Sequence, residues 1–141
     1  AIRKGIDNNP NADQIEKLKM LCENVLQPAR DHFGRVKVTS GYRSPELCVA
    51  IGSSINSQHA KAEAVDFEVI GIDNAEVADW VKMNCNTDQL ILEYYTPGEP
   101  NSGWIHASWI PFQPRGQYLR AYRENKKTNY KPIIGKAVDL T

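Results

Sequence analysis

The stretch AEAVDFEVI, residues 62–70, alternates between apolar and polar side chains as a half-buried β-strand does. Val65, Phe67 and Val69 fall on one face of this strand, and Asp66 falls on the opposite face. The apolar face predicts packing against the core of the fold. A carboxylate within such a strand needs a partner, because an unpaired buried charge is costly.

Three helices are expected around this strand. The spacing of apolar residues predicts a long amphipathic helix over 11–33, which begins with a capping box formed by Asn11 and Gln14. A short helix is expected from Ser44, a good N-cap residue, to about Gly52, and a third helix from about 74 to 83.

The remaining segments predict further strands. They are RVKVTS (35–40), QLILEYY (89–95), WIHASWI (104–110) and QYLRAYRE (117–124). The tail from Lys126 onward is predicted to be irregular. Because several of these strands are joined by hairpin-like connections, we predict one α+β domain over residues 1–141, with a mainly antiparallel sheet and helices packed largely on one face.

The composition sets bounds on the partners. The chain has 141 residues, with 17 basic and 17 acidic side chains, so it can build one core and has no global charge that attracts nucleic acid or a membrane. No apolar run reaches the roughly 20 residues that span a bilayer, and the first residues show no signal-peptide pattern. We expect a monomer that binds neither nucleic acid nor membrane. The basic C-terminal run is expected to be a solvated face or to attract an anionic polymer.

The cysteines point to neither a disulfide framework nor a cysteine-rich zinc site. Cys22, Cys48 and Cys85 are odd in number and widely spaced, without a C-x-x-C motif. We expect them to be reduced, buried thiols.

Three other residues carry side chains that bind metals. His59 lies in the loop before the 62–70 strand, Asp66 lies within that strand, and His106 lies within WIHASWI. Side chains on one face of neighbouring strands come within about 5 Å of each other, so Asp66 and His106 can converge while His59 reaches in from the edge. A catalytic zinc ion is typically held by three such groups, which predicts one Zn²⁺ on the sheet. Taken singly, a loop histidine is more often a surface residue, and a strand aspartate is often paired with a lysine or arginine.

Four motifs in this order, SGYRSPEL (40–47), SQHAKAEAVDF (57–67), LILEYY (90–95) and GWIHAS (103–108), resemble the zinc D-alanyl-D-alanine carboxypeptidase and endolysin family, particularly its small phage and bacterial members. The resemblance covers about residues 36–110. It implies a shared α+β fold, zinc ligation by His59, Asp66 and His106, and hydrolysis of a peptide bond next to a D-amino acid in peptidoglycan stem peptides. It also implies that Arg43 binds the substrate carbonyl or carboxylate and supports the oxyanion, a task that suits a guanidinium fork.

The catalytic base is the point at which this sequence departs from the family. Many relatives carry Glu or Asp three residues before the second histidine ligand, and here that position is Gly103. The best replacement is Glu93, which alternation places on one face of its strand. If that is also the face of His106, Glu93 takes a proton from zinc-activated water and passes it to the leaving amine. Weaker candidates for the base are Glu63, Glu68 and Glu99.

Further side chains are expected beside this centre. The predicted substrate contacts besides Arg43 are Ser57, Gln58, Tyr95 and Trp104. Ser108 is expected to support a metal ligand from behind, although each serine could equally be only a turn or strand residue, and strand aromatics are more often core. The family often has Gly where this chain has Ala62, which fits unless the backbone there needs a positive φ.

The sequence therefore predicts a zinc-dependent peptidoglycan hydrolase that acts on the cell wall. The alternative is a zinc-containing wall-binding or virion module that has lost its base, and Gly103 is the reason to consider it. The sequence leaves open which bond is cut, and whether the enzyme is a carboxypeptidase or an endopeptidase.

Overall fold

The helices follow the predicted segments closely. The computed structural model describes residues 5–141, and its helical elements are α1 (Ala12–Leu21), the π-helical turn η2 (Cys22–Leu26), α2 (Gln27–Phe33), α3 (Pro45–Ala50), α4 (Asn74–Asn84) and the 3₁₀ turn η3 (Ala137–Asp139). The capping box is present, because Asn11 Oδ1 accepts from the Gln14 N–H at 2.9 Å and Gln14 Oε1 accepts from the Asn11 N–H at 2.8 Å. Ser44 Oγ caps α3 through the Leu47 N–H.

In the first helical segment only some of the apolar residues are buried. Leu21, Val25 and Ala29 are buried, whereas Ile15 and Cys22 are exposed. The wide turn η2 lies between α1 and α2 and rotates the apolar stripe from one to the other. The prediction that every cysteine is buried is therefore wrong for Cys22, although all three thiols are free.

Six strands form one sheet, in the order β1-β2-β4-β3-β5-β6. Their bounds are β1 (Val36–Ser40), β2 (Ala64–Val69), β3 (Gln89–Glu93), β4 (Trp104–Ser108), β5 (Gln117–Glu124) and β6 (Lys127–Pro132). All neighbours pair antiparallel except β3 and β5, which are parallel. The strand β6 corrects the prediction of an irregular tail: a tight turn at Asn125 and Lys126, both with positive φ, returns the chain along β5.

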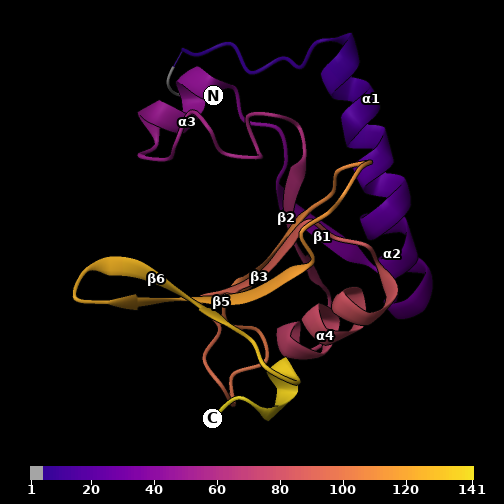
Figure 1. Ribbon diagram of the computed structural model, residues 1–141, viewed down its shortest axis with the longest axis vertical. Helices are drawn as coiled ribbons and strands as arrows, with labels where there is room; N and C mark the ends of the chain where they lie inside the picture. Colours follow the sequence, from indigo (N-terminus) through magenta and orange to yellow (C-terminus); the bar gives the residue numbers. More distant parts are fainter. Residues whose placement is uncertain (1–4) are drawn as a thin grey trace.

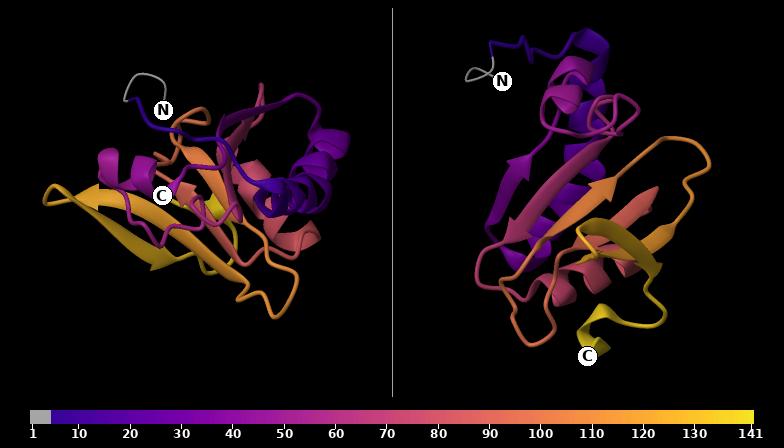
Figure 2. Two further views of the ribbon diagram at one scale, coloured as in Figure 1. Left: turned by 90° about the horizontal axis from the view of Figure 1, so that it is seen from above. Right: turned by 90° about the vertical axis from the view of Figure 1, so that its left-hand side faces the viewer.

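The sheet separates an apolar layer from an open cleft. Figures 1 and 2 show α1, α2 and α4 packed against one face, while α3 and the β5–β6 hairpin flank the other face. Val65, Phe67 and Val69 join residues of α4 in the core, as the alternation of β2 predicts. The α+β fold with a mainly antiparallel sheet and helices largely on one face is thus confirmed.

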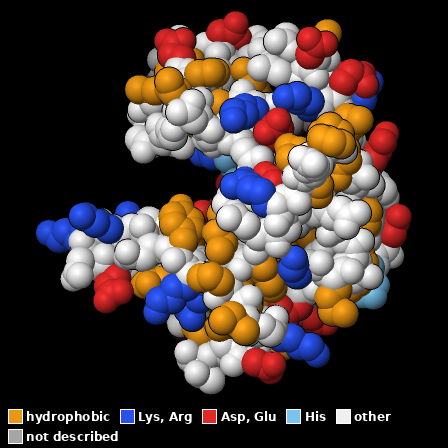
Figure 3. Space-filling view, viewed as in Figure 1, with side chains coloured by type: hydrophobic (Ala, Val, Ile, Leu, Met, Phe, Trp, Pro, Cys, Tyr) orange, Lys and Arg blue, Asp and Glu red, His pale blue; other side chains and the backbone are white. Residues whose placement is uncertain are grey.

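The surface between α3 and the hairpin is hollowed. Figure 3 shows this hollow between the upper part of the molecule and the projecting hairpin, whose tip carries basic side chains. None of the helices within residues 5–141 is long and apolar enough to cross a membrane.

Candidate metal centre and cleft

The register of β2 and β4 brings the first two metal-binding side chains together. Asp66 and His106 are directly opposed in this antiparallel pair, and both are buried on the face opposite the core. Because opposed side chains on one face are close neighbours, Asp66 Oδ1 lies 3.0 Å from His106 Nδ1. The predicted convergence of these two strands is present in the structure.

His59 reaches the same point from the loop before β2. Its ring Nδ1 lies 2.7 Å from the Gly41 carbonyl oxygen, and its Nε2 lies 3.3 Å from Asp66 Oδ1. A carbonyl only accepts, so Nδ1 must carry the proton, and in the neutral ring Nε2 then presents a lone pair to a carboxylate. This buried Nε2 has no hydrogen-bond partner within residues 5–141. Two acceptors facing each other need either a second proton on the ring or a cation between them.

The geometry of the three groups suits a small divalent cation. One ligand atom from each of His59, Asp66 and His106 can be chosen so that all lie within 4.8 Å of one another. Zinc bonds of about 2.0–2.2 Å in a tetrahedron would separate two ligand atoms by roughly 3.3 Å, close to the 3.0 Å and 3.3 Å seen here. Two imidazoles and one carboxylate are also ligands that zinc prefers.

The surroundings of Asp66 favour the ionised form of its carboxyl group. Burial alone would raise the pKa of this carboxyl, but its hydrogen bond with His106 and its close contact with the His59 ring outweigh burial and place the pKa well below its usual range. The acid is therefore ready to act as an anionic ligand.

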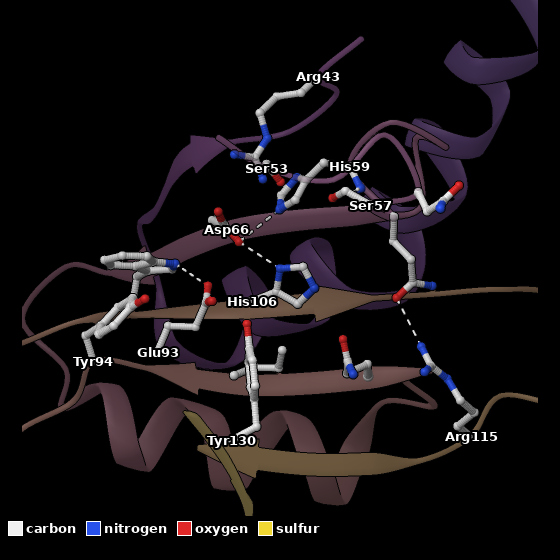
Figure 4. Close-up of a pocket in the computed structure, with 15 residues that line it drawn as sticks. Arg43, Ser53, Ser57, His59, Asp66, Glu93, Tyr94, His106, Arg115 and Tyr130 are labelled. Atoms are coloured by element: carbon white, nitrogen blue, oxygen red, sulfur yellow. Dashed lines mark hydrogen bonds and ion pairs between the residues drawn. The ribbon is translucent and has the colours of Figure 1, made fainter. Parts of the chain in front are cut away.

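Arg43 enters the cleft above this cluster (Figure 4). Its backbone N–H donates to the His59 carbonyl at 3.1 Å, which joins the arginine segment to the histidine loop. Asn8 fixes the same segment, because its Nδ2 donates to the Tyr42 carbonyl and its Oδ1 accepts from the Ser44 N–H. Arg43 Nε is buried and has no hydrogen-bond partner in the part of the chain that the structure describes. A guanidinium with a free donor beside the metal cluster can bind an anionic or carbonyl oxygen.

Glu93 lies in the same cleft, at the end of β3. It is opposed to Trp104 of β4, whose indole Nε1–H donates to Glu93 Oε2 at 2.6 Å. Burial raises the pKa of the Glu93 carboxyl, and the charge of His106 and the Trp104 bond only partly offset this rise. A carboxylate with a raised pKa is a better proton acceptor near neutral pH.

The family model for Peptidase M15 matches residues 1–107. This chain belongs to that family, the zinc D-Ala-D-Ala carboxypeptidases. A comparison with curated proteins found no significant match. The family is one of metallopeptidases. The triad of His59, Asp66 and His106 could hold the metal of such a peptidase.

The structure explains why this peptidase carries no acid at Gly103. The glycine has a φ of 65°, and a Cβ atom there would lie 1.9 Å from the carbonyl oxygen of Glu93. A Cβ atom would collide with the backbone of β3 and the positive φ favours glycine, so a side chain fits here only if the strand moves. Glu93, on the opposing strand, is the carboxylate that lines the cleft beside His59, Asp66 and His106.

Ala62 stands in a backbone conformation that favours glycine. Its φ is 58° and it is fully buried, so the condition under which the alanine would fit poorly is met. The left-handed conformation costs an L-residue roughly 1–2 kcal/mol. The strain falls in the turns that carry His59 toward β2.

Tyr95, predicted as a substrate contact, does not line the cleft. Tyr94 has a φ of 56°, which breaks the alternation after Glu93 and turns Tyr94, rather than Tyr95, into the cleft. The Tyr95 hydroxyl donates to Asp73 at 3.0 Å, and its ring packs against the core. The Tyr94 hydroxyl lies 2.6 Å from Thr128 Oγ1 and ties β3 to the hairpin.

The other predicted residues take mixed positions. Trp104 and Ser57 line the cleft, and Ser57 Oγ accepts from the His59 N–H at 3.2 Å. Gln58 also lines the cleft, but both ends of its amide are bonded to other side chains. Ser108 Oγ accepts from the Gln89 N–H and donates to the Gln89 carbonyl, so it joins β3 to β4 instead of supporting a metal ligand.

The weaker candidates for the base lie elsewhere. Glu63 pairs with Lys17 at 3.3 Å, and Glu68 accepts from Asn74 at 3.1 Å. Glu99 is exposed in the turn after β3. Glu93 is the glutamate that lines the cleft with the triad.

Two cleft residues lie beyond the family match and escaped sequence reasoning. Arg115 comes from the β4–β5 connection, and Tyr130 comes from β6. In Figure 4 the Tyr130 hydroxyl points from the hairpin toward Glu93 and His106, and Arg115 lies at the opposite end of the cleft from Tyr94. The strand β6 was predicted as irregular tail, so no alternation was available to place Tyr130.

Proposed function

We propose that this chain is a zinc-dependent peptidase that hydrolyses a peptide bond next to a D-amino acid in peptidoglycan stem peptides. The observation that carries the proposal is the unpartnered Nε2 of His59, which faces Asp66 and His106 in a cleft that also holds Arg43 and Glu93. Family membership supports the same class of reaction.

Each side chain has a role that its surroundings favour. His59, Asp66 and His106 hold the zinc ion, which when bound supplies Lewis-acid activation of water and of the scissile carbonyl. Glu93 takes a proton from the attacking water and returns it to the leaving amine, a step for which its raised pKa is suited. Arg43 donates to the oxygen on which negative charge develops.

The size of the cleft agrees with a peptide substrate. Its volume is about 570 Å³, within the usual range for ligand pockets, and one wall is the β5–β6 hairpin. All of these side chains come from one chain, so we also propose that the enzyme acts as a monomer on the cell wall.

Digestion of purified peptidoglycan tests the proposal. We expect the protein to release fragments that carry a new amino or carboxyl terminus at a D-amino acid, with loss of activity in a chelator and recovery on addition of zinc. Glu93→Gln should lower the rate by about 10²–10⁴ while zinc still binds. The matched control is Glu99→Gln, the same change in an exposed turn, which should leave the rate unaltered.

Mass spectrometry of the products identifies the bond. Release of a single terminal D-amino acid would define a carboxypeptidase, and release of cross-linked or internal fragments an endopeptidase. Binding to the wall with no cleavage by the zinc-loaded protein would contradict the proposal and support a wall-binding module.

A further inference from the structure

Asp88 is a buried carboxylate at the start of β3 that the proposed reaction does not use. Arg115, from the β4–β5 connection, donates to both of its oxygens: Nε to Oδ1 at 3.0 Å and Nη2 to Oδ2 at 2.7 Å. The backbone N–H of Arg115 adds a third bond to Oδ1 at 2.9 Å. Such a two-pronged pair has a fixed geometry, unlike most surface ion pairs.

Gln58 connects this pair to the metal-binding loop. Its Nε2 donates to Asp88 Oδ2 at 2.8 Å, and its Oε1 accepts from Arg115 Nη2 at 3.3 Å. The next residue in the chain is His59. We refer to Asp88, Arg115 and Gln58 together as the clamp.

The loop that carries His59 has turns but no regular helix or strand. The Gln58 carbonyl accepts from the N–H groups of Lys61 and Glu63, so the backbone of Gln58 is the centre of these turns. Ala62, with its strained φ, lies in the same turns. A loop with such a conformation keeps it only where surrounding contacts hold it.

We propose that the clamp is a positioning device that holds the 53–63 loop so that His59 Nε2 faces Asp66 and His106. The inference rests on the proposed function, because it assigns the clamp to the zinc site. Asp88 and Arg115 act through Gln58 and its neighbour His59, and they take no part in the chemistry.

The charges of the clamp favour this role over substrate binding. Both oxygens of Asp88 are bonded, and its charge neutralises that of Arg115 at close range. The Arg115 bonds hold the pKa of Asp88 at about 2, against an opposing effect of burial, so the pair stays charged at any pH at which the protein would act. The Asp88 side chain is 3% exposed, whereas Arg115 is 49% exposed and covers it from the cleft side.

Zinc affinity measured by competition with a chelating dye tests the clamp. Arg115→Ala and Gln58→Ala should each weaken zinc binding roughly tenfold, the lower end of the effect of residues that orient metal ligands. Arg115→Lys, which keeps the charge but loses the two-pronged geometry, should give a smaller loss.

A control of similar cost to stability separates positioning from general destabilisation. Tyr118→Phe removes a partly buried 2.7 Å hydrogen bond to Asp79 on the core face of the sheet, and zinc affinity should then stay within about twofold of the unsubstituted protein. Amide hydrogen exchange of the zinc-free protein gives a second readout. Arg115→Ala should speed exchange in the 53–63 loop and leave α4 unchanged, whereas Tyr118→Phe should leave the loop unchanged.

The outcomes distinguish this inference from the proposed function. If the unsubstituted protein binds zinc but Arg115→Ala and Gln58→Ala bind it equally well, the clamp is overturned and the peptidase proposal stands. An equal loss of zinc affinity in Tyr118→Phe would also overturn the clamp. If Arg115→Ala does not fold, Gln58→Ala decides, because it leaves the Asp88–Arg115 pair in place. A failure of the unsubstituted protein to bind zinc would overturn both.

Discussion

The two faces of β2 and β4 differ in the side chains that they carry: one face is apolar and packs in the core, and the other is polar and faces the cleft. Phe67 and Ile105 face the helices and are fully buried among apolar side chains. Asp66 and His106, one residue away along each strand, face the cleft and present charged or acceptor atoms to one another. The apolar face is complete in itself, whereas beside the polar face the buried Nε2 of His59 has no hydrogen-bond partner within residues 5–141. Residues that form the core and residues that form the candidate site therefore occupy adjacent positions in each strand.

The largest expected effect comes from breaking the polar face. Asp66→Asn should lower zinc affinity by at least about a hundredfold, because it removes a ligand charge, and should abolish activity. Ile105→Val, on the other face, should cost about 0.5–1.5 kcal/mol of unfolding free energy with no change in zinc affinity. Chelator competition measures the zinc affinity of both variants, and urea unfolding measures their unfolding free energy. Equal effects of the two substitutions on zinc binding would show that the faces are not independent.

At Gly103 the chain leading into β4 passes very close to the backbone of Glu93 at the end of β3. Gly103→Ala should destabilise the protein by about 2–4 kcal/mol, because its Cβ would lie 1.9 Å from the Glu93 carbonyl oxygen and the strand must move. Activity should fall with it, since Glu93 shifts too. The control is Gly98→Ala, where φ is 88° but no atom lies within 4 Å, and only the smaller conformational cost should appear. A Gly103→Ala protein as stable as the Gly98→Ala protein would contradict the close approach.

Substitution of Trp104 tests how its hydrogen bond affects the pKa of Glu93, the proposed base. The indole N–H donates to Glu93 and favours the ionised carboxylate, so Trp104→Phe should raise the Glu93 pKa further. Because the base must be ionised to act, the acidic limb of the kcat/KM profile should move to higher pH. Tyr95→Phe, which removes a bond to Asp73 outside the cleft, should leave the profile in place. An unmoved acidic limb in Trp104→Phe would argue against Glu93 as the base.

The smallest effect is expected at Ala62. Ala62→Gly relieves roughly 1–2 kcal/mol of left-handed strain but adds backbone freedom to the unfolded chain and removes a buried methyl group, which together cost about as much. The free energy of unfolding, measured by thermal denaturation, should change by no more than about 0.5 kcal/mol. A loss greater than 2 kcal/mol would show that the methyl group is needed to pack the His59 loop.

Short-range patterns predicted most of the metal centre. The alternation in 62–70 and 104–110 placed Asp66 and His106 on the cleft face, and the family motifs pointed to His59 and Arg43. The placement of Asp66 and His106 holds because side-chain direction in a strand depends on the parity of position alone.

What the sequence could not predict depends on long-range contacts or on backbone conformation. The positive φ of Tyr94 breaks the alternation of β3, so that Tyr94 lines the cleft and Tyr95 does not, and no local sequence pattern predicts this change. Arg115 meets Gln58 across 57 positions in the chain, so their bond is visible only in the fold. The tail lacks the apolar alternation of a half-buried strand, because β6 is mostly exposed, and it was therefore not recognised.

The single parallel pair, β3 with β5, has a consequence for where this chain can be shortened. The family match ends at residue 107, so a fragment cut there would keep β3 and lose β5. The backbone groups of Leu90 to Leu92 would then form a bare apolar margin, a template for strand addition between molecules. In the whole chain the outer margin is β6, with Lys127, Lys131 and Pro132, residues that discourage such addition. The hairpin thus covers the edge of β3 as well as forming a wall of the cleft.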